Sequence, residues 1–173
     1  YTEVQVEAAE KLKQLSGMDK VFFANSGAEA NEGAIKLARK YTTAKNPEKY
    51  EIISAKHSFH GRTLATLTAT GQDKYHQGLG PLPEGFSYVT YNDKEEIAKA
   101  ISDKTCAVLL EAIQGEGGVY VPDDDYLPYV RELCDKHGAL LIIDEIQAGM
   151  GRTGTFFGYE QFGIKADIVT LAK

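Results

Sequence analysis

The sequence predicts an α/β layered fold with a mostly parallel β-sheet and helices on both faces. Segments with the apolar alternation of strands take turns along the chain with segments of helical periodicity, which is the order found in such folds. Residues 28–41 carry apolar side chains at helical spacing on one face. Residues 139–145, ALLIIDE, form a continuous apolar run, which is typical of strands covered on both faces.

Four further segments of the amino-terminal part can be assigned from local signals. A helix is expected over about 2–15, because a Ser-Gly pair follows it and favours a helix end. The apolar run VFFAN, residues 21–25, is interpreted as a short strand. YEIISAK, residues 50–56, is interpreted as the next strand, and residues 61–71 as a short helix that ends at a glycine.

Residues 72–85 are the expected long loop, because four glycines or prolines lie between positions 78 and 83. The elements expected after it are strand 86–90, helix 93–102, strand 106–112, loop 113–122, helix 123–137, strand 139–145, glycine-rich loop 149–158 and a terminal strand over 168–171. In a parallel sheet, ligands bind beyond the carboxyl ends of the strands. The residues that follow each strand are therefore the candidates for a functional site.

Composition restricts the classes of function. The chain has 19 basic and 25 acidic residues, so its net charge of -6 does not favour a nucleic acid or an anionic membrane as partner. No apolar run approaches the roughly 18 residues of a membrane span. Two isolated cysteines without a CxxC pair indicate a reducing, cytoplasmic setting. Because the chain begins at Tyr1 and ends directly after a strand, we expect it to be part of a longer protein.

The stretch NSGAEANE, residues 25–32, has the sequence of a capped helix start. Ser26 and Glu29 form an S-x-x-E capping box, and Gly27 permits close approach of another group to the backbone. The amides of Gly27 and Ala28 would point outward at the positive end of the helix, which suits a phosphate group. The alternative is a well-capped helix that binds nothing.

The stretch HSFHGRT, residues 57–63, places bulky planar groups where a loop is normally small and polar. Phe59 and His60 could cover the face of a flat ring, and the Arg62 guanidinium could bind a carboxylate in a bidentate manner. His57 and His60 have ligand-like spacing, but without a third ligand they make a poor metal site, and no metal is expected. The alternative is an ordinary surface turn.

Two glutamates lie near the carboxyl end of the strand 106–112. Glu111 is in the strand, and Glu116 follows within the flexible turn QGEGG. Most glutamates in such positions are solvated or neutralise an arginine. On their own they indicate a site only weakly.

The stretch LIIDEIQAGMGRTG, residues 141–154, gives the sharpest signal. Asp144 follows large apolar residues, so its carboxylate should emerge from the core at the ligand-binding edge of the sheet. A partly buried aspartate lowers the stability of the fold unless a cation pairs with its carboxylate. Gln147, three residues further on, could hydrogen-bond the same ligand.

Two nucleotide-binding interpretations of this stretch are weak. An apolar strand followed by Asp-Glu is typical of the magnesium-binding strand of P-loop ATPases, but no Gly-Lys pair exists anywhere in the chain. Gly149, Gly151 and Gly154 match G-x-G-x-x-G, but the segment after them is too short and glycine-broken for the helix that a dinucleotide site requires. We interpret this glycine pattern as coincidental.

The chain ends with ADIVTLAK, in which Lys173 follows an alternating apolar strand. A phosphate-binding turn, an aromatic cover, a strand-end aspartate and a lysine together describe a site for pyridoxal phosphate. Five stretches follow one another across residues 25–173 in the order of a known family: NSGAEANEGAIKLARKY, SFHGRT, EAIQGEGGV, DEIQAGMGRTG and ADIVTLAK. With suitable gaps between them, they resemble the class III aminotransferases of fold type I.

The resemblance implies the roles of the cofactor-binding residues. Ser26, Gly27 and Ala28 would hold the cofactor phosphate. Phe59 would pack on the pyridine ring, and His60 would lie beside it.

The resemblance also implies which residues perform the chemistry. Asp144 would pair with the ring nitrogen, Gln147 would lie near the ring hydroxyl, and Lys173 would form the Schiff base. Arg62 would bind a substrate carboxylate, and the remaining lining of the substrate site would include Glu111 and Glu116. The family usually carries proline where this chain has Ala112, a difference that touches no catalytic atom.

At the level of the whole protein, the resemblance implies transamination between N-acetylornithine, or a related ω-amino donor, and 2-oxoglutarate. Ornithine, 4-aminobutyrate and other ω-amino substrates remain open, as does an aminomutase. It further implies a cytoplasmic homodimer with active sites at the subunit interface. Residues 1–173 would be part of the cofactor-binding large domain, ending at the Schiff-base lysine and inactive in isolation, with the small domain absent.

Overall fold

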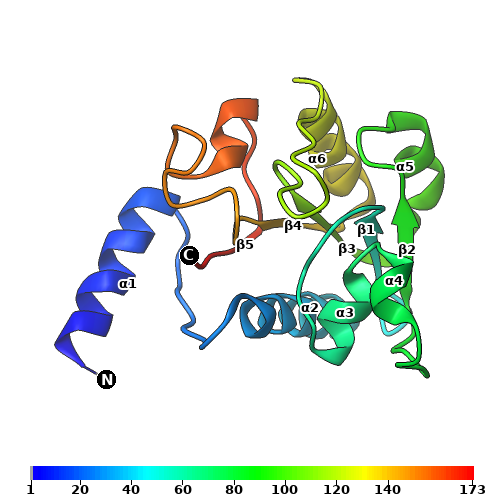
Figure 1. Cartoon of the computed structure of the whole chain (residues 1–173), viewed down its shortest axis with the longest axis horizontal. Helices are drawn as coiled ribbons and strands as arrows, with labels where there is room; N and C mark the ends of the chain where they lie inside the picture. Colours follow the sequence, from blue (N-terminus) through cyan, green and yellow to red (C-terminus); the bar gives the residue numbers. More distant parts are fainter. Residues whose placement is uncertain (1) are drawn as a thin grey trace.

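The computed structural model describes residues 2–173 and contains a five-stranded sheet of order β2-β1-β3-β4-β5, in which every pairing is parallel (Figure 1). The strands are β1 (Glu51–Ala55), β2 (Phe86–Val89), β3 (Thr105–Glu111), β4 (Leu140–Asp144) and β5 (Ile168–Thr170). β3 and β4 lie inside the sheet, and their apolar runs are buried. The α/β class and the parallel sheet expected from the sequence are therefore confirmed.

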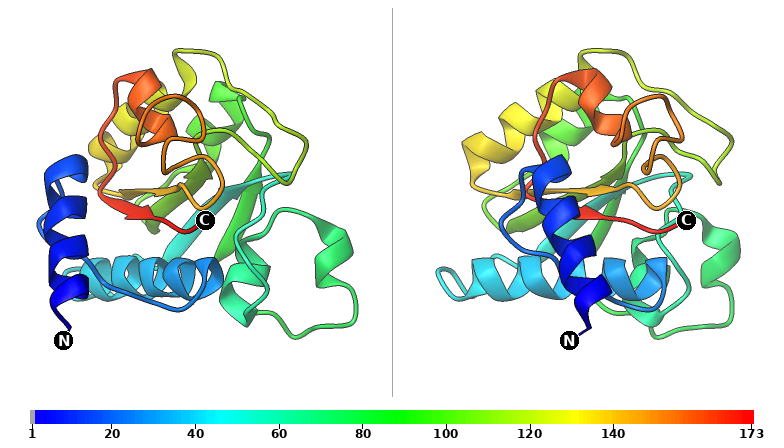
Figure 2. Two further views of the ribbon diagram at one scale, coloured as in Figure 1. Left: turned by 60° about the vertical axis from the view of Figure 1, so that its left-hand side comes forward. Right: turned by 90° about the vertical axis from the view of Figure 1, so that its left-hand side faces the viewer.

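Helices cover both faces of this sheet (Figures 1 and 2). On one face lie α2 (Gly27–Thr43), α3 (Leu64–Ala69) and α4 (Asp73–His76), and on the other lie α5 (Lys94–Ala100), α6 (Tyr126–His137) and the 3₁₀ helix η1 (Gly158–Phe162). Successive strand residues point to opposite faces, so Leu109 packs beneath α2 while Val108 and Leu110 pack beneath α5 and α6. The strands of the sheet thus supply two separate apolar cores.

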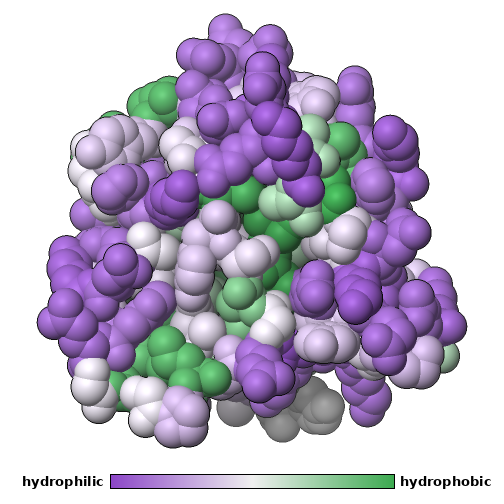
Figure 3. Space-filling model, turned by 90° about the vertical axis from the view of Figure 1, so that its right-hand side faces the viewer, coloured by the Kyte–Doolittle hydropathy of each residue, from purple (hydrophilic) through white to green (hydrophobic). Residues whose placement is uncertain are grey.

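Two regions lie at the margins of this core. Helix α1 (Glu3–Ser16) contains no buried residue and stands beside the sheet (Figure 2). The face over β2, α4 and α5 is mostly hydrophilic, with smaller apolar areas between the polar groups (Figure 3). None of the helices described within residues 2–173 combines the length and apolar character needed to cross a bilayer.

The strand predicted at 21–25 is wrong, because this segment is irregular and pairs with no other described segment. Phe22 is 80% exposed and Phe23 is 45% exposed. Aromatic and β-branched residues favour strands only where a hydrogen-bonded neighbour and a packing surface exist. Residues 2–173 supply neither for this segment.

Smaller differences concern helix ends. The helix expected over 61–71 is shorter and begins after its N-cap Thr63. The loop expected over 72–85 contains the single-turn helix α4. The helix expected from 123 begins at Tyr126. Such shifts are common, because capping contacts decide where a helix ends.

Gly71 fixes the loop 57–63 beside the sheet. It forms a parallel bridge with Lys56, and the amide of His57 donates to its carbonyl at 2.8 Å. A Cβ atom at this glycine would lie 2.0 Å from the carbonyl oxygen of Ala55. Only a residue without a side chain permits this approach.

We therefore expect Gly71→Ala to lower the free energy of unfolding by about 3 kcal/mol, because the backbone of β1 must move to admit the methyl group. Chemical denaturation of the full-length protein would measure the change. Gly33→Ala is the matched control: its Cβ would meet only the Phe22 ring at 3.7 Å, and it should be neutral or stabilising by up to about 1 kcal/mol. Equal stability of the two variants would contradict the expectation.

Candidate active site

A cavity of about 470 Å³ opens at the carboxyl edge of the sheet, where β4 and β5 meet the amino end of α2. Its lining residues are Gly27, Ala28, Asn31, Phe59, His60, Gly61, Arg62, Asp144, Ile146, Gln147, Ala172 and Lys173. Most of the residues singled out in the sequence therefore face one space. Ser26, Glu111 and Glu116 are not among those that line it.

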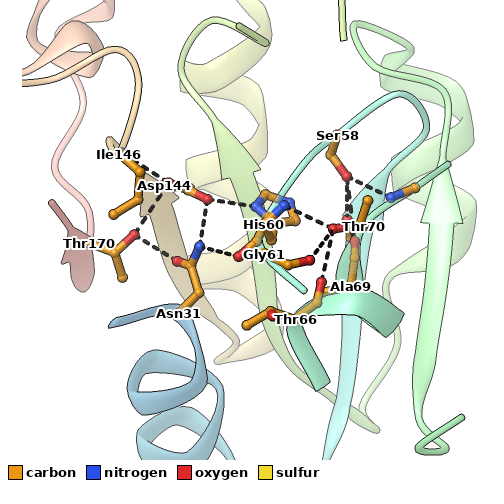
Figure 4. Close-up of polar contacts among 12 residues, drawn as sticks. Asn31, Ser58, His60, Gly61, Thr66, Ala69, Thr70, Asp144, Ile146 and Thr170 are labelled. Carbon is orange, nitrogen blue, oxygen red and sulfur yellow. Dashed lines mark hydrogen bonds and ion pairs between the residues drawn. The ribbon is translucent and has the colours of Figure 1, made fainter. Parts of the chain in front are cut away.

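Asp144 is the last residue of β4 and is 3% exposed. Its Oδ2 accepts hydrogen bonds from Asn31 Nδ2 at 2.7 Å and lies 2.8 Å from His60 Nδ1 (Figure 4). Its Oδ1 accepts from the amide of Ile146 at 3.0 Å and from the Thr170 hydroxyl at 3.5 Å. A buried carboxylate needs such partners, because an unpaired one would lose its hydration without replacement.

Asn31 holds this arrangement together and was missed in the sequence. Its Nδ2 also donates to the carbonyl of His60 at 2.8 Å, and its Oδ1 accepts from the Thr170 hydroxyl at 2.7 Å (Figure 4). The amide is therefore fixed on both sides. A signal did exist, because Asn31 is a polar residue in the apolar stripe that continues with Ala34 and Ala38.

The loop that carries His60 is tied back to the end of α3 (Figure 4). The amide of His60 donates to Thr70 Oγ1 at 2.9 Å, and this hydroxyl donates to the carbonyl of Thr66 at 2.9 Å. Ser54 Oγ and Ser58 Oγ lie 3.1 Å apart near the carbonyl of Ala69. The imidazole of His60 is thereby held against Asp144.

Glu111 lies beside Asp144 in the β3–β4 register and is 4% exposed. Burial, followed by the negative charge of Asp144, raises its pKa well above the ordinary value. Its Oε2 and the Nε2 of His60 have no hydrogen-bond partner among the described residues. A protonated Glu111 avoids placing a second negative charge next to Asp144.

His60, Glu111 and Asp144 each place a ligand-type atom within 4.8 Å of the others, which is the spacing of a possible cation site. His57, the sequence partner considered for His60, is not part of this group. His60 Nδ1 and Asp144 Oδ2 already contact each other directly at 2.8 Å, and both oxygens of Asp144 have hydrogen-bond partners. The arrangement therefore fits a hydrogen-bonded cluster better than a metal centre.

The start of α2 forms one wall of the cavity. Ser26 is the N-cap, and its Oγ accepts from the amide of Glu29 at 3.1 Å. The carboxylate of Glu29 accepts from the amide of Asn25 at 2.6 Å, so the expected capping box is displaced by one residue. First-turn amides such as those of Gly27 and Ala28 have no partner within a helix and remain available to an anion.

Two glycines allow close packing at this wall. A Cβ atom at Gly27 would lie 2.9 Å from Ile146 Cγ2, and one at Gly61 would lie 2.7 Å from Ala28 Cβ. Gly61 also has φ of 132°, a conformation that other residues rarely adopt. The two glycines therefore let Ile146 pack against the amino end of α2 and let the loop 57–63 pack against Ala28.

The remaining predicted residues lie around the mouth of the cavity. Phe59 meets the Tyr75 ring edge-on, with centroids 5.6 Å apart. Arg62 and Lys173 are exposed, and both line the cavity. Gln147 packs so close to Gly115 that a Cβ there would lie 2.8 Å from its Oε1.

Glu145 is a third buried carboxyl group, which was not singled out from the sequence. It is fully buried, and it accepts hydrogen bonds from the amides of Gly158 at 2.7 Å and Tyr159 at 3.0 Å. These bonds fold the glycine-rich loop back onto β4 and support Ile146 and Gln147 at the cavity. Burial raises the pKa of Glu145 to about 7, and the charges of Asp144 and Glu160 act in the same direction.

This pKa predicts a pH dependence of stability. The ordinary value is 4.5, so between about pH 4.5 and 7 the folded state binds more protons at Glu145 than the unfolded state does. The free energy of unfolding should therefore fall as pH rises through this window, by about 3 kcal/mol from this group. Glu145→Gln should remove this part of the slope in denaturation of the cofactor-free, full-length protein.

The exposed Glu132 of α6 provides the control for this pH series. Glu132→Gln should leave the slope as in the unmodified protein, because this exposed side chain takes no part in the hydrogen bonds that hold Glu145. A slope that persists in Glu145→Gln would show that other groups cause it.

The fold and this site define a class of protein that comparison with known families identifies. Residues 1–173 match the family described as aminotransferase class-III, and the chain belongs to this family. It is 56% identical over its whole length to an acetylornithine aminotransferase of Caldanaerobacter subterraneus. The chain spans 44% of the length of that relative.

Solved structures of transaminases have the same fold. The N-acetylornithine aminotransferase of Stenotrophomonas maltophilia K279a superposes with a TM-score of 0.83 at 42% identity, over 100% of this chain and 43% of that one. An amine transaminase from an uncultivated Pseudomonas species, solved in a PLP-bound form, gives a TM-score of 0.93 at 31% identity. The match covers 100% of this chain and 45% of that one.

Proposed function

We propose that the protein containing this chain is a pyridoxal-phosphate-dependent aminotransferase of arginine biosynthesis. It transfers the amino group of N-acetylornithine to 2-oxoglutarate and releases the semialdehyde and glutamate. The observation that carries the proposal is the single cavity that gathers Lys173, Asp144 and the amino end of α2. The names of the acetylornithine-acting relatives support this choice of substrate.

The residues around the cavity fit pyridoxal phosphate. The amino end of α2 suits the phosphate, because Gly27 and Ala28 line the cavity and the first-turn amides of a helix have no partner within it. Ser26 supports this turn as the N-cap. Phe59 offers an aromatic surface for the ring, and the buried carboxylate of Asp144 faces the same space. Bound pyridoxal phosphate supplies an electron sink for the substrate carbon that bears the amino group.

The chain's own residues then have distinct tasks. Asp144 holds a proton at the ring nitrogen, and His60 and Asn31 keep its carboxylate in position. Gln147 lines the same cavity, and its side-chain amide would serve the ring hydroxyl. The Nζ of Lys173 holds the cofactor and then takes up and returns the proton of the substrate carbon.

The substrate is held by other groups. Arg62 orients a substrate carboxylate, since its planar guanidinium can form two parallel hydrogen bonds. Phe59 excludes water from one face of the ring. Glu111 and Glu116 lie outside the cavity lining, so we propose that they act through their neighbours and not by direct contact in this part of the protein.

We further propose the setting of this site in the whole protein. Residues 1–173 form part of a cofactor-binding large domain, and a smaller domain is supplied by the rest of the chain. Two copies form a homodimer with active sites at their interface. The protein acts in the cytoplasm on amino-acid and 2-oxo-acid substrates.

Lys173→Ala in the full-length protein should abolish covalent attachment of pyridoxal phosphate and lower turnover by several orders of magnitude, because Lys173 is the one lysine of residues 2–173 that lines the cavity. Mass spectrometry after borohydride reduction would detect the attached cofactor independently of activity. Lys165→Ala alters an exposed lysine outside the cavity and should change neither property. Retention of the attached cofactor in Lys173→Ala would refute the assignment.

A panel of amino donors tests the substrate. N-Acetylornithine should give the highest kcat/KM with 2-oxoglutarate, above ornithine and 4-aminobutyrate, because the comparison with relatives favours the acetylated donor. Glutamate formation would be measured for each donor at equal enzyme concentration. A higher kcat/KM for ornithine or 4-aminobutyrate would assign the protein to another branch of the family.

A further inference from the structure

Arg62, in the loop 57–63, lies beside two aromatic rings that contact each other edge-on. Its guanidinium carbon lies 5.8 Å from the centroid of Phe59 and 5.9 Å from the centroid of Tyr75. The two rings come from different segments, since Tyr75 belongs to α4. Arg62 takes part in none of the ion pairs within residues 2–173, so its charge has no carboxylate partner in this part of the chain.

Glu116 has the carboxylate best placed to pair with the Arg62 guanidinium, but both of its oxygens already have other partners. The hydroxyl of Tyr75 donates to Oε1 at 2.8 Å, and Lys74 Nζ lies 3.8 Å from the same oxygen. The side-chain Nε2 of Gln72 donates to Oε2 of Glu116. Both oxygens of Glu116 therefore have partners from the segment 72–75.

This segment is anchored independently of Glu116. The side-chain Nε2 of Gln72 also donates to the carbonyl of Ser58 at 3.0 Å, and the Tyr75 ring contacts the Phe59 ring. The pKa of Glu116 is lowered, first by the hydrogen bond from Gln72 and then by Tyr75 and Lys74, and the charge of Arg62 adds to the effect. Arg62 is thus close enough to act on Glu116 without pairing with it.

We propose that Tyr75 is a positioning residue for substrate binding: with Gln72, it holds Glu116 away from Arg62 and keeps Arg62 free for a substrate carboxylate. This inference rests on the proposed function, in which Arg62 binds that carboxylate. A released Glu116 would form a bidentate pair with Arg62. A substrate would then have to break this pair before it could bind.

Tyr75→Phe tests the inference, because it removes the hydroxyl and leaves the ring against Phe59 and Arg62. In the full-length, cofactor-loaded protein, the Kd of glutarate, an unreactive dicarboxylate, should rise about threefold to fivefold, the range of an exposed ion pair. Isothermal titration calorimetry would measure it. Tyr41→Phe is the matched control, since it removes an exposed tyrosine hydroxyl whose one hydrogen bond within residues 2–173 is accepted from Lys45, and the Kd of glutarate should be unchanged.

The double variant Tyr75→Phe/Glu116→Gln separates positioning from a general structural effect. A neutral glutamine cannot form the competing ion pair, so the Kd of glutarate should return to the wild-type value. A Kd that stays raised in the double variant, or a wild-type Kd in Tyr75→Phe, would overturn the inference.

Arg62→Ala distinguishes this failure from that of the proposed function. If Arg62→Ala weakens glutarate binding and Tyr75→Phe does not, only the role of Tyr75 is refuted. If Arg62→Ala leaves the Kd unchanged, the proposed carboxylate-binding role of Arg62 is itself wrong, and the inference falls with it.

Discussion

The buried carboxylate of Asp144 is the constraint on which the rest of the site depends. A carboxylate that is 3% exposed would be strongly destabilising without donors, since burial removes its hydration. The donors come from α2, from the loop 57–63 and from β5, and the chain bends at Ile146 to supply an amide. The hydrogen bonds to the Asp144 carboxylate therefore fix the relative positions of four segments around the cavity.

The neighbouring carboxyl groups show that the surroundings of each group decide its protonation state. Asp144 has donors on both oxygens, whereas Glu111, next to it in the sheet, has an unpartnered Oε2 and a raised pKa. Glu145 is also buried, but two backbone amides hold it on the loop side. A single buried negative charge at the cavity is electrostatically compatible with a cationic ring, whereas two adjacent charges would repel each other.

Features that depend on local sequence could be predicted, and features that depend on distant contacts could not. Periodicity was enough for the parallel α/β class, and position at a strand end was enough to single out Asp144 and Lys173. Asn31 was missed because its partner is 113 positions away. The strand over 21–25 failed for the same reason, since a strand exists only if another segment pairs with it, and apolar residues alone do not reveal that partner.

The long span of these contacts has a consequence for how the protein is made. Asn31 is hydrogen-bonded to Thr170, 139 positions later, and β5 is the last strand along residues 2–173. Synthesis proceeds from the amino end, so α2 and the loop 57–63 emerge long before their partners. In every nascent chain that stops short of residue 170, Asp144 lacks part of its donor set. Within residues 2–173, assembly of the pocket is therefore a late event in synthesis, and it couples the ability to bind a ligand to the emergence of β5.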